Sequence, residues 1–383
     1  MDIESIATGL IYRNPKPYLR SLHAYFPSVV LLPNGDLLAT MVLGSAFESV
    51  DCHVYVARST DSGDTWALEG PMYKGALDRA TSETYRITCM DDGEIVAFGV
   101  RCDRSDPEEG LTNPETLGFV PTELTLFRST DDGHTWSGPE IVVPPLVGPE
   151  FEICCPIVPL RDGRWLAPTS TWRAWDGTCP NGMKAIALCS YDRGQTWPEY
   201  VDVMDGHTEH IIHWEQKIIV LEDDRLLSVA WAFNEAKGED LPNRYALSED
   251  GGRSFGPPRS TGLSGQTLTP VHLGGNRVLC VYRRTDRPGL WATVARVEGD
   301  RWINEAEAPI WGAPVSTVGN KDADTMVEAF HVLRFGAPCA LILPDGEIFV
   351  AFWCVEDCVS NIRWFRLRVV DHSSAKCEVR SAK

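Results

Sequence analysis

An eight-residue pattern that recurs four times places the strongest constraint on how this chain can fold. The copies read STDSGDTW at residues 59–66, STDDGHTW at 129–136, SYDRGQTW at 190–197 and, less closely, SEDGGRSF at 248–255. They follow one another at intervals of roughly 60 to 70 residues. One copy would be an ordinary surface turn, but four at a similar spacing indicate a chain assembled from repeated supersecondary units.

The segments between the octamers alternate strand-like runs with tight turns. Six turns separate pairs of runs rich in β-branched and aromatic residues: Asn34-Gly35, Asp92-Gly93, Asp162-Gly163, Asp223-Asp224, Gly275-Asn276 and Asp345-Gly346. Asn-Gly and Asp-Gly in this setting are the strongest short-range signal for a β-hairpin, because both turn residues need a positive φ. A third run follows each of the first five hairpins, and in four of these units the octamer then turns the chain toward a fourth strand.

The last unit, residues 335–370, is one strand short. It shows three strand-like runs, and the N-terminal segment SIATGLIYR, residues 5–13, can supply the fourth and close a ring. The sequence therefore predicts an all-β fold, a six-bladed β-propeller of four-stranded antiparallel blades closed by the N-terminal strand. We expect one domain over residues 1–383.

The residue types of the octamer suit a turn rather than a reaction. Its Asp can accept hydrogen bonds from nearby backbone N–H groups, its Gly supplies a positive φ, and its Trp can lie in an apolar seam. We therefore expect the octamers to stabilise the fold and to bind neither substrate nor metal.

Net charge and hydropathy exclude several classes of partner. The formal net charge is −19, and no basic run offsets it, so the sequence argues against binding to nucleic acid or to an anionic membrane. No run of eighteen apolar residues is present. The N-terminus lacks the basic and apolar regions of a secretory signal, which predicts a cytoplasmic protein while leaving secretion open. The twelve cysteines are dispersed, as expected for reduced thiols.

The octamer and its spacing resemble the Asp-box motif, S-x-D-x-G-x-T-W, of the sialidase (neuraminidase) superfamily, whose members have a six-bladed propeller. The resemblance implies an exo-acting glycoside hydrolase and a few active-site positions. Asp51 can fill the family's acid/base position, with Glu48 close enough to compete, and Glu215 matches the Glu that polarises the nucleophile. Three positions depart from the family: Tyr25 and Trp231 replace arginines, and Ala337 stands where the nucleophilic Tyr is expected.

Propeller geometry adds a second set of candidates, because inner strands begin, and second strands end, at the same mouth of the central channel. Arg101, Arg173 and Arg283 end second strands in three blades, which suggests an anion-binding cluster, although each could instead bridge blades through a carboxylate. Further candidates for substrate binding are Arg86, Trp172 and Trp231. Candidate proton-transfer groups on the inner strands are His23, Tyr85 and His213, beside Asp51 and Glu215.

Three functions follow from these candidates. The first is a sialidase-like glycoside hydrolase that removes a terminal acidic sugar from an oligosaccharide or glycoconjugate, with a non-standard active site. The second is a polysaccharide lyase on uronate sugars, with His23, Tyr85 or His213 as the base, which needs no Tyr nucleophile. The third is a non-catalytic glycan-binding propeller. We expect no cofactor and no metal site, and homo-oligomer formation stays open.

Overall fold

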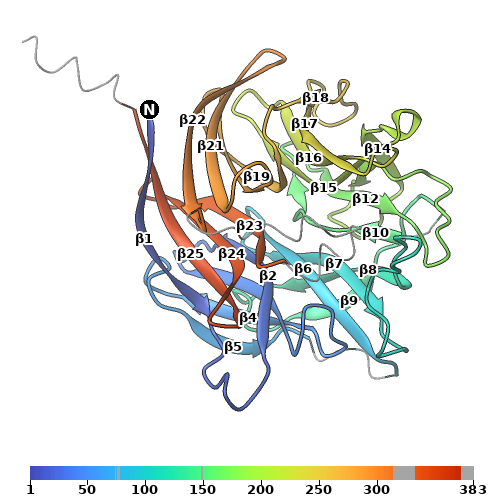
Figure 1. Ribbon diagram of the computed structural model, residues 1–383, viewed down its shortest axis with the longest axis vertical. Coiled ribbons are helices and arrows are strands. Elements are labelled where there is room, and N and C mark those ends of the chain that lie inside the picture. Colours follow the sequence, from blue (N-terminus) through green and yellow to red (C-terminus); the bar gives the residue numbers. More distant parts are fainter. Residues whose placement is uncertain (74, 76–77, 148–149, 314–332, 372–383) are drawn as a thin grey trace, which may run out of the picture.

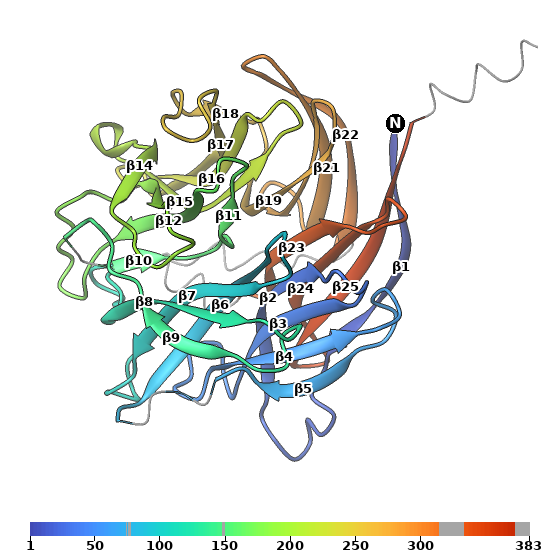
Figure 2. The ribbon, with the colours of Figure 1, turned by 180° about the vertical axis from the view of Figure 1, so that it is seen from behind.

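The computed structural model describes residues 1–73, 75, 78–147, 150–313 and 333–371. They form six antiparallel sheets arranged around a central axis, as Figures 1 and 2 show from opposite sides. The six-bladed propeller predicted from the turn signals is thus confirmed. Among the described residues, no helix is long and apolar enough to cross a membrane.

Each of the first three blades runs outward from the axis in chain order. Blade 1 consists of β2 (His23–Leu31), β3 (Leu37–Gly44), β4 (His53–Ser59) and β5 (Ala67–Pro71). Blade 2 consists of β6 (Thr81–Cys89), β7 (Ile95–Asp103), β8 (Thr122–Ser129) and β9 (Ser137–Ile141). Blade 3 consists of β10 (Glu150–Glu152) and β11 (Val158–Pro159), which both pair with β12 (Trp165–Trp172), followed by β13 (Ala185–Ser190) and β14 (Glu199–Met204).

The later blades follow the same order, after a short 3₁₀ turn at His207–Glu209. Blade 4 consists of β15 (Ile211–Val220), β16 (Leu226–Asn234), β17 (Glu239–Ser248) and β18 (Arg259–Ser260). Blade 5 consists of β19 (Gly265–Gly274), β20 (Arg277–Arg284), β21 (Leu290–Glu298) and β22 (Arg301–Trp311). Blade 6 consists of β23 (Phe335–Ile342), β24 (Ile348–Glu356), β25 (Val359–Val370) and the N-terminal strand β1 (Asp2–Tyr12).

The ring closes as expected, because β1 pairs with β25 in antiparallel register from Asp2 opposite Val370 to Tyr12 opposite Ile362. Figure 1 shows the first and last strands, blue and red, side by side. Blade 3 departs from the pattern, since its inner strand is interrupted between Glu152 and Val158. Pro156 lies in the gap, where a residue without an N–H cannot donate to the ladder.

Burial falls from the middle of each blade to its edge. Every residue of β3 and of β12 is buried, whereas β5 and β9 are largely exposed. The buried faces of adjacent blades pack against each other, and the aromatic residue of an octamer joins this packing. The ring of Trp66 lies 6.0 Å from that of Phe349, which belongs to the neighbouring blade 6.

The octamer between β4 and β5 explains why its sequence repeats. Asp61 accepts hydrogen bonds from the Thr65 hydroxyl at 2.6 Å, the Thr65 backbone N–H at 2.9 Å and the Ser59 hydroxyl at 2.7 Å, and these bonds lower the pKa of Asp61 to about 2. Gly63 has φ of +96°, and a Cβ there would lie 2.7 Å from the Phe349 ring. The same hydrogen bonds recur at Asp131, Asp192 and Asp250.

Candidate functional site

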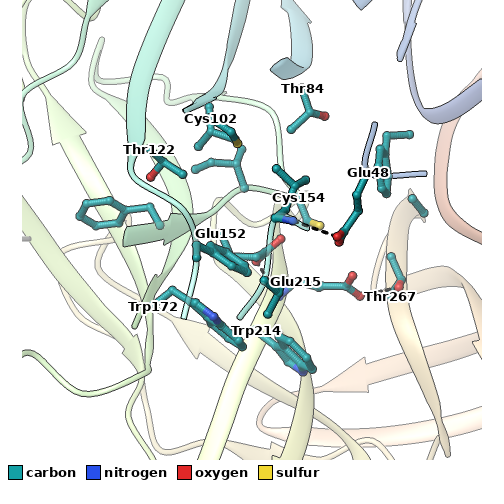
Figure 3. Close-up of a pocket in the computed structure, with 18 of the residues that line it drawn as sticks. Glu48, Thr84, Cys102, Thr122, Glu152, Cys154, Trp172, Trp214, Glu215 and Thr267 are labelled. Carbon is teal, nitrogen blue, oxygen red and sulfur yellow. Dashed lines mark hydrogen bonds between the residues drawn. The ribbon is translucent and has the colours of Figure 1, made fainter. Parts of the chain in front are cut away.

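A cavity of about 210 Å³ lies where the inner strands of all six blades meet. One residue from each inner strand or its extension contributes to its wall: Phe26, Arg86, Glu152, Glu215, Thr267 and Ala337. The cavity is mainly apolar and aromatic, with five charged side chains in its lining. Figure 3 shows three of them, Glu48, Glu152 and Glu215. Such a concave site with a few convergent polar groups is the usual form of a small-molecule binding site.

A bulge in four of the inner strands shapes this cavity. The pairing register shifts at Tyr25/Ser28, Trp214/Lys217, Gln266/Thr269 and Gly336/Cys339. Inside each shift, one residue has a positive φ: Phe26 at 51°, Glu215 at 49°, Thr267 at 57° and Ala337 at 45°. These four residues all line the cavity. A bulge re-aims a side chain, so the propeller turns one residue per strand toward the axis by the same device.

Glu152 and Glu215 form a carboxylate pair in the cavity. The backbone N–H of Glu215 donates to Oε2 of Glu152 at 3.0 Å. Burial and the nearby charge of Glu215 raise the pKa of Glu152 to about 7. The hydroxyl of Thr267 donates to Oε2 of Glu215, and Figure 3 shows the three side chains together. One carboxyl therefore holds its proton near neutral pH while its neighbour accepts a hydrogen bond from Thr267.

A third carboxylate, Glu48, enters the cavity from the loop between β3 and β4. Its Oε2 accepts a hydrogen bond from the backbone N–H of Leu111 at 2.9 Å. Figure 3 shows Glu48 on the other side of the cavity from the tryptophans. Asp51, the expected acid/base, does not line this cavity. Its Oδ1 accepts from the Ser45 N–H and hydroxyl, both at 3.0 Å. Burial tends to raise its pKa, but hydrogen bonds from Ser45 and Ser49 lower it overall.

Two arginines in the cavity are held by neighbouring oxygens. Arg283 donates to Oε1 of Gln266 at 3.0 Å and to the carbonyl of Phe335 at 2.9 Å. Burial lowers its pKa, against the opposing charges of Glu215 and Asp240. Arg86 donates to the carbonyl of Phe26 at 2.9 Å, and its guanidinium lies 5.8 Å from the centre of the Phe26 ring.

One wall of the cavity is a stack of aromatic rings. The Phe119 and Trp172 rings lie 5.2 Å apart, and the Trp172 and Trp214 rings lie 4.7 Å apart, only 8° from parallel. Trp231 continues the stack behind Trp214, at 4.1 Å, but it does not line the cavity. Its indole N–H donates to Asp240 at 2.7 Å. Trp231, predicted to bind substrate, therefore supports the ring wall from behind.

The predicted arginine cluster does not form. Arg101 pairs with Glu123, its cross-strand neighbour on β8, at 2.6 Å. Arg173 pairs with Glu235 and lines a separate hollow. Only Arg283 of the three reaches the axial cavity. The alternative interpretation, in which each strand-end arginine forms an ion pair with a carboxylate, therefore holds for Arg101 and Arg173.

The predicted bases also lie outside the cavity. Tyr85 is buried, shares a hydrogen bond of 2.9 Å with the Thr125 hydroxyl, and has its pKa raised by burial. His213 is buried, with an Nδ1 that has no hydrogen-bond partner, and burial lowers its pKa to about 4. Nδ1 of His23 accepts from the Ser360 N–H at 3.1 Å, and burial lowers its pKa. None of the three has access to a ligand in the axial cavity.

Of the predicted site residues, the structure brings four to the cavity: Glu215, Arg86, Arg283 and Trp172. It adds Glu152, Trp214 and Thr267, which the sequence-based prediction did not assign, and Glu48, which that prediction named only as a competitor of Asp51. The position of Glu152 at the start of an inner strand was the only signal for it, and Glu150 shared that signal. Within the described ranges, no group of three or more side chains could hold a metal ion.

Comparison with known proteins identifies the family. The model of the BNR repeat-like domain matches residues 35–307, so the chain belongs to this family. No curated protein matched the sequence. A protein of unknown function from Dyadobacter fermentans has a similar structure, with a TM-score of 0.73 and 21% identity over 96% of this chain and 99% of that one.

Two kinds of glycoside hydrolase share the propeller. A GH93 α-L-arabinofuranosidase of Fusarium graminearum, solved in complex with arabinobiose, gives a TM-score of 0.64 at 14% identity, covering 97% of this chain and 99% of that one. Trypanosoma rangeli sialidase gives 0.62 at 13% identity, covering 91% of this chain but 55% of that one. At these identities the likeness concerns the fold, which is that of a glycoside hydrolase-like propeller.

Proposed function

We propose that this protein is a glycoside hydrolase that removes a terminal sugar from a glycan, with Glu152 as the general acid and Glu215 as the base or nucleophile. The observation that carries the proposal is the carboxylate pair. Glycoside hydrolysis needs one carboxyl that is protonated and one that is ionised, and unequal environments are how a protein separates the two roles.

The surroundings of each carboxyl fit its role. The raised pKa of Glu152 keeps it protonated up to about neutral pH, as a proton donor to the leaving oxygen requires. Arg283 lies close enough to Glu215 for their opposite charges to interact, and the Thr267 hydroxyl donates to Oε2 of Glu215. The Phe119–Trp172–Trp214 wall offers flat apolar surface to the C–H face of a sugar ring.

We further propose a neutral rather than an acidic terminal sugar. The cluster of three arginines expected to hold a substrate carboxylate is not formed, and the two arginines in the cavity are accompanied by three glutamates, Glu48, Glu152 and Glu215. With Glu152 protonated, the other two glutamates still balance the two arginines, so the lining offers no excess positive charge to a substrate carboxylate. Among relatives of similar length, the arabinofuranosidase bound to arabinobiose acts on a neutral sugar.

A panel of aryl glycosides tests the proposal. The wild-type protein should release the aryl group from a neutral pentoside such as an α-L-arabinofuranoside, and should leave a sialoside intact. Glu215→Gln should lose most of its activity on every substrate. Glu152→Gln should lose most activity on substrates with poor leaving groups and much less on nitrophenyl glycosides, whose leaving group needs no protonation.

Two comparisons make the residue assignment decisive. Glu48→Gln should lose similar activity on substrates with good and with poor leaving groups. If instead Glu48→Gln shows the leaving-group dependence and Glu152→Gln does not, Glu48 is the general acid. Glu150→Gln is the matched control, because Glu150 also has a pKa raised by burial to about 7 but does not line the cavity. Turnover of sialosides alone would favour the acidic-sugar function, and binding without any turnover would favour a glycan-binding propeller.

A further inference from the structure

A second cavity, of about 150 Å³, lies next to the first along the propeller axis. The two cavities share Arg86, Cys154, Thr267 and Ala337, so these residues form the partition between them. The inner strands of all six blades, or their extensions, line the second cavity as well. The proposed hydrolysis makes no use of this space.

Lys217 is the unusual feature of this cavity. The residue is 8% exposed, and its Nζ is buried with no hydrogen-bond partner among the described residues. Arg86, 5% exposed, is the second cation in the lining. No Asp or Glu belongs to the lining as the structure describes it. A buried ammonium without a partner is costly, and a counter-charge removes that cost.

The protein itself supplies little counter-charge. Glu152 is close enough to Lys217 for an electrostatic interaction, but it lines the first cavity. Because burial and the charge of Glu215 raise its pKa, Glu152 holds its proton up to about neutral pH. The cysteine thiols Cys154, Cys155 and Cys339 line the second cavity, but burial raises their pKa values, so they stay neutral.

The rest of the lining limits which anion can fit. Most of it is apolar, including Val29, Ile87 and Ile218. Hydroxyls are largely committed, since Thr269 donates to the carbonyl of Pro338 at 2.6 Å and Thr267 donates to Glu215. Phosphate or sulfate would need hydrogen bonds to four oxygens and would bring a net charge close to −2. A halide needs few donors and tolerates apolar neighbours.

We propose that Lys217 and Arg86 bind a monovalent, halide-sized anion in this second cavity. The anion neutralises the ammonium group two residues after Glu215, at the base of the proposed active site. The site does not depend on which sugar the protein hydrolyses, because the proposed hydrolysis makes no use of the second cavity.

Thermal unfolding of the purified full-length chain tests the site without any substrate. Potassium bromide is titrated against potassium gluconate, whose anion is far larger than a halide and is strongly hydrated, at constant ionic strength. Above the dissociation constant, each tenfold rise in bromide should raise Tm by roughly 1–2 °C. Equal Tm values in the two salts would overturn the proposal, as would stabilisation by phosphate and not by bromide.

Matched lysine variants assign the effect to Lys217. In Lys217→Met the Tm should no longer depend on bromide, because the cation is gone while the side-chain length is kept. Lys184→Met is the control, since Lys184 is also mostly buried but pairs with Asp202 at 2.6 Å, and it should keep the bromide dependence. Bromide dependence that survives in Lys217→Met would refute the assignment.

Diffraction from wild-type crystals grown in bromide covers the case in which Lys217→Met does not fold. An anomalous peak within contact distance of Lys217 Nζ is expected. Its absence at a bromide concentration that shifts Tm would overturn the site. Neither experiment depends on hydrolysis, so failure of the proposed enzymatic function and failure of the anion site are separately visible.

Discussion

The Asp-box turns join the outer strands of four blades, and the bulges sit on the inner strands around the axis. Both regions place residues in the left-handed backbone region, Ser62, Asp132 and Arg193 in the turns and Phe26, Glu215, Thr267 and Ala337 in the bulges. This conformation costs a non-glycine residue about 1–2 kcal/mol. The two regions differ in how that cost is offset.

In the turns, side chains adjacent in sequence stabilise the backbone, so the fold dictates their identity and the octamer repeats. In the bulges, the paired strands on either side hold the backbone in place. The residue inside a bulge is therefore an aromatic, a carboxylate, a hydroxyl or a methyl group, according to what the cavity needs. The residue types are therefore constrained where a turn is stabilised by its own side chains. They can vary where the paired strands of the sheet stabilise the backbone.

The largest expected effect of a single change is at a bulge. Glu215→Gln should lower kcat/KM by about 10²–10⁴-fold, the range for losing an essential proton-transfer group, while Tm stays close to wild type. Steady-state kinetics with an aryl glycoside, together with thermal unfolding, measures both. A variant that unfolds would place Glu215 with the fold-determining residues, as in the turns.

The pH profile is expected to give the next largest effect. Because Glu152 acts protonated and its pKa is raised to about 7, kcat/KM should fall about tenfold per pH unit above that value. Stability should change in the same direction. A carboxyl whose folded pKa lies above its unfolded value stabilises the fold fully below the unfolded value and loses that contribution as pH rises through the folded one. The activity trend should be absent from Glu152→Gln, and the stability trend should be weaker but still present there, because Glu150 keeps a pKa raised to about 7. A wild-type activity profile that is flat between pH 6 and 8 would contradict the acid assignment.

At an Asp-box turn, the expected effect is on stability alone. Asp131→Ala removes the acceptor for the Thr135 hydroxyl and N–H and for the Ser129 hydroxyl. Because Asp131 is exposed, we expect a loss of about 0.5–2 kcal/mol, similar to the loss of a helix cap. Urea unfolding measures the loss, and kcat/KM per folded molecule should not change. A selective loss of activity would show that the two regions are not as separate as described.

A pair of reciprocal glycine substitutions compares the two regions directly, and the smallest expected effect is at the bulge. Gly63→Ala puts a Cβ against Phe349 at a φ of +96°, and should cost about 1–3 kcal/mol. Ala337→Gly relieves the left-handed strain but loses a contact and adds freedom to the unfolded chain, so its net effect should stay below about 1 kcal/mol. Comparable losses at both positions, measured by urea unfolding, would mean that the sheet does not support the bulges.

The architecture could be predicted from the sequence because its signals are local. Asn-Gly and Asp-Gly turns and the Ser–Asp–Thr contacts of the octamer each involve a few consecutive residues. The site could be predicted only in part, since Glu215 was placed by its position in a motif, whereas Glu152 depends on a neighbour 63 residues away. The arginines show the same limit. The sequence indicates where a strand ends, but it does not indicate the carboxylate that pairs with Arg101 or Arg173 and holds it away from the axis.

The pairing of β1 with β25 has a consequence for how the chain folds during its synthesis. The Thr8 hydroxyl donates to the carbonyl of Trp364, a partner 356 residues later in the chain. During synthesis the first strand therefore leaves the ribosome long before its partner exists, and its edge stays exposed to other chains until residues 359–370 have been made. Contacts this distant in sequence form late, so we expect ring closure to be the slow, final step of folding and the stage most exposed to aggregation.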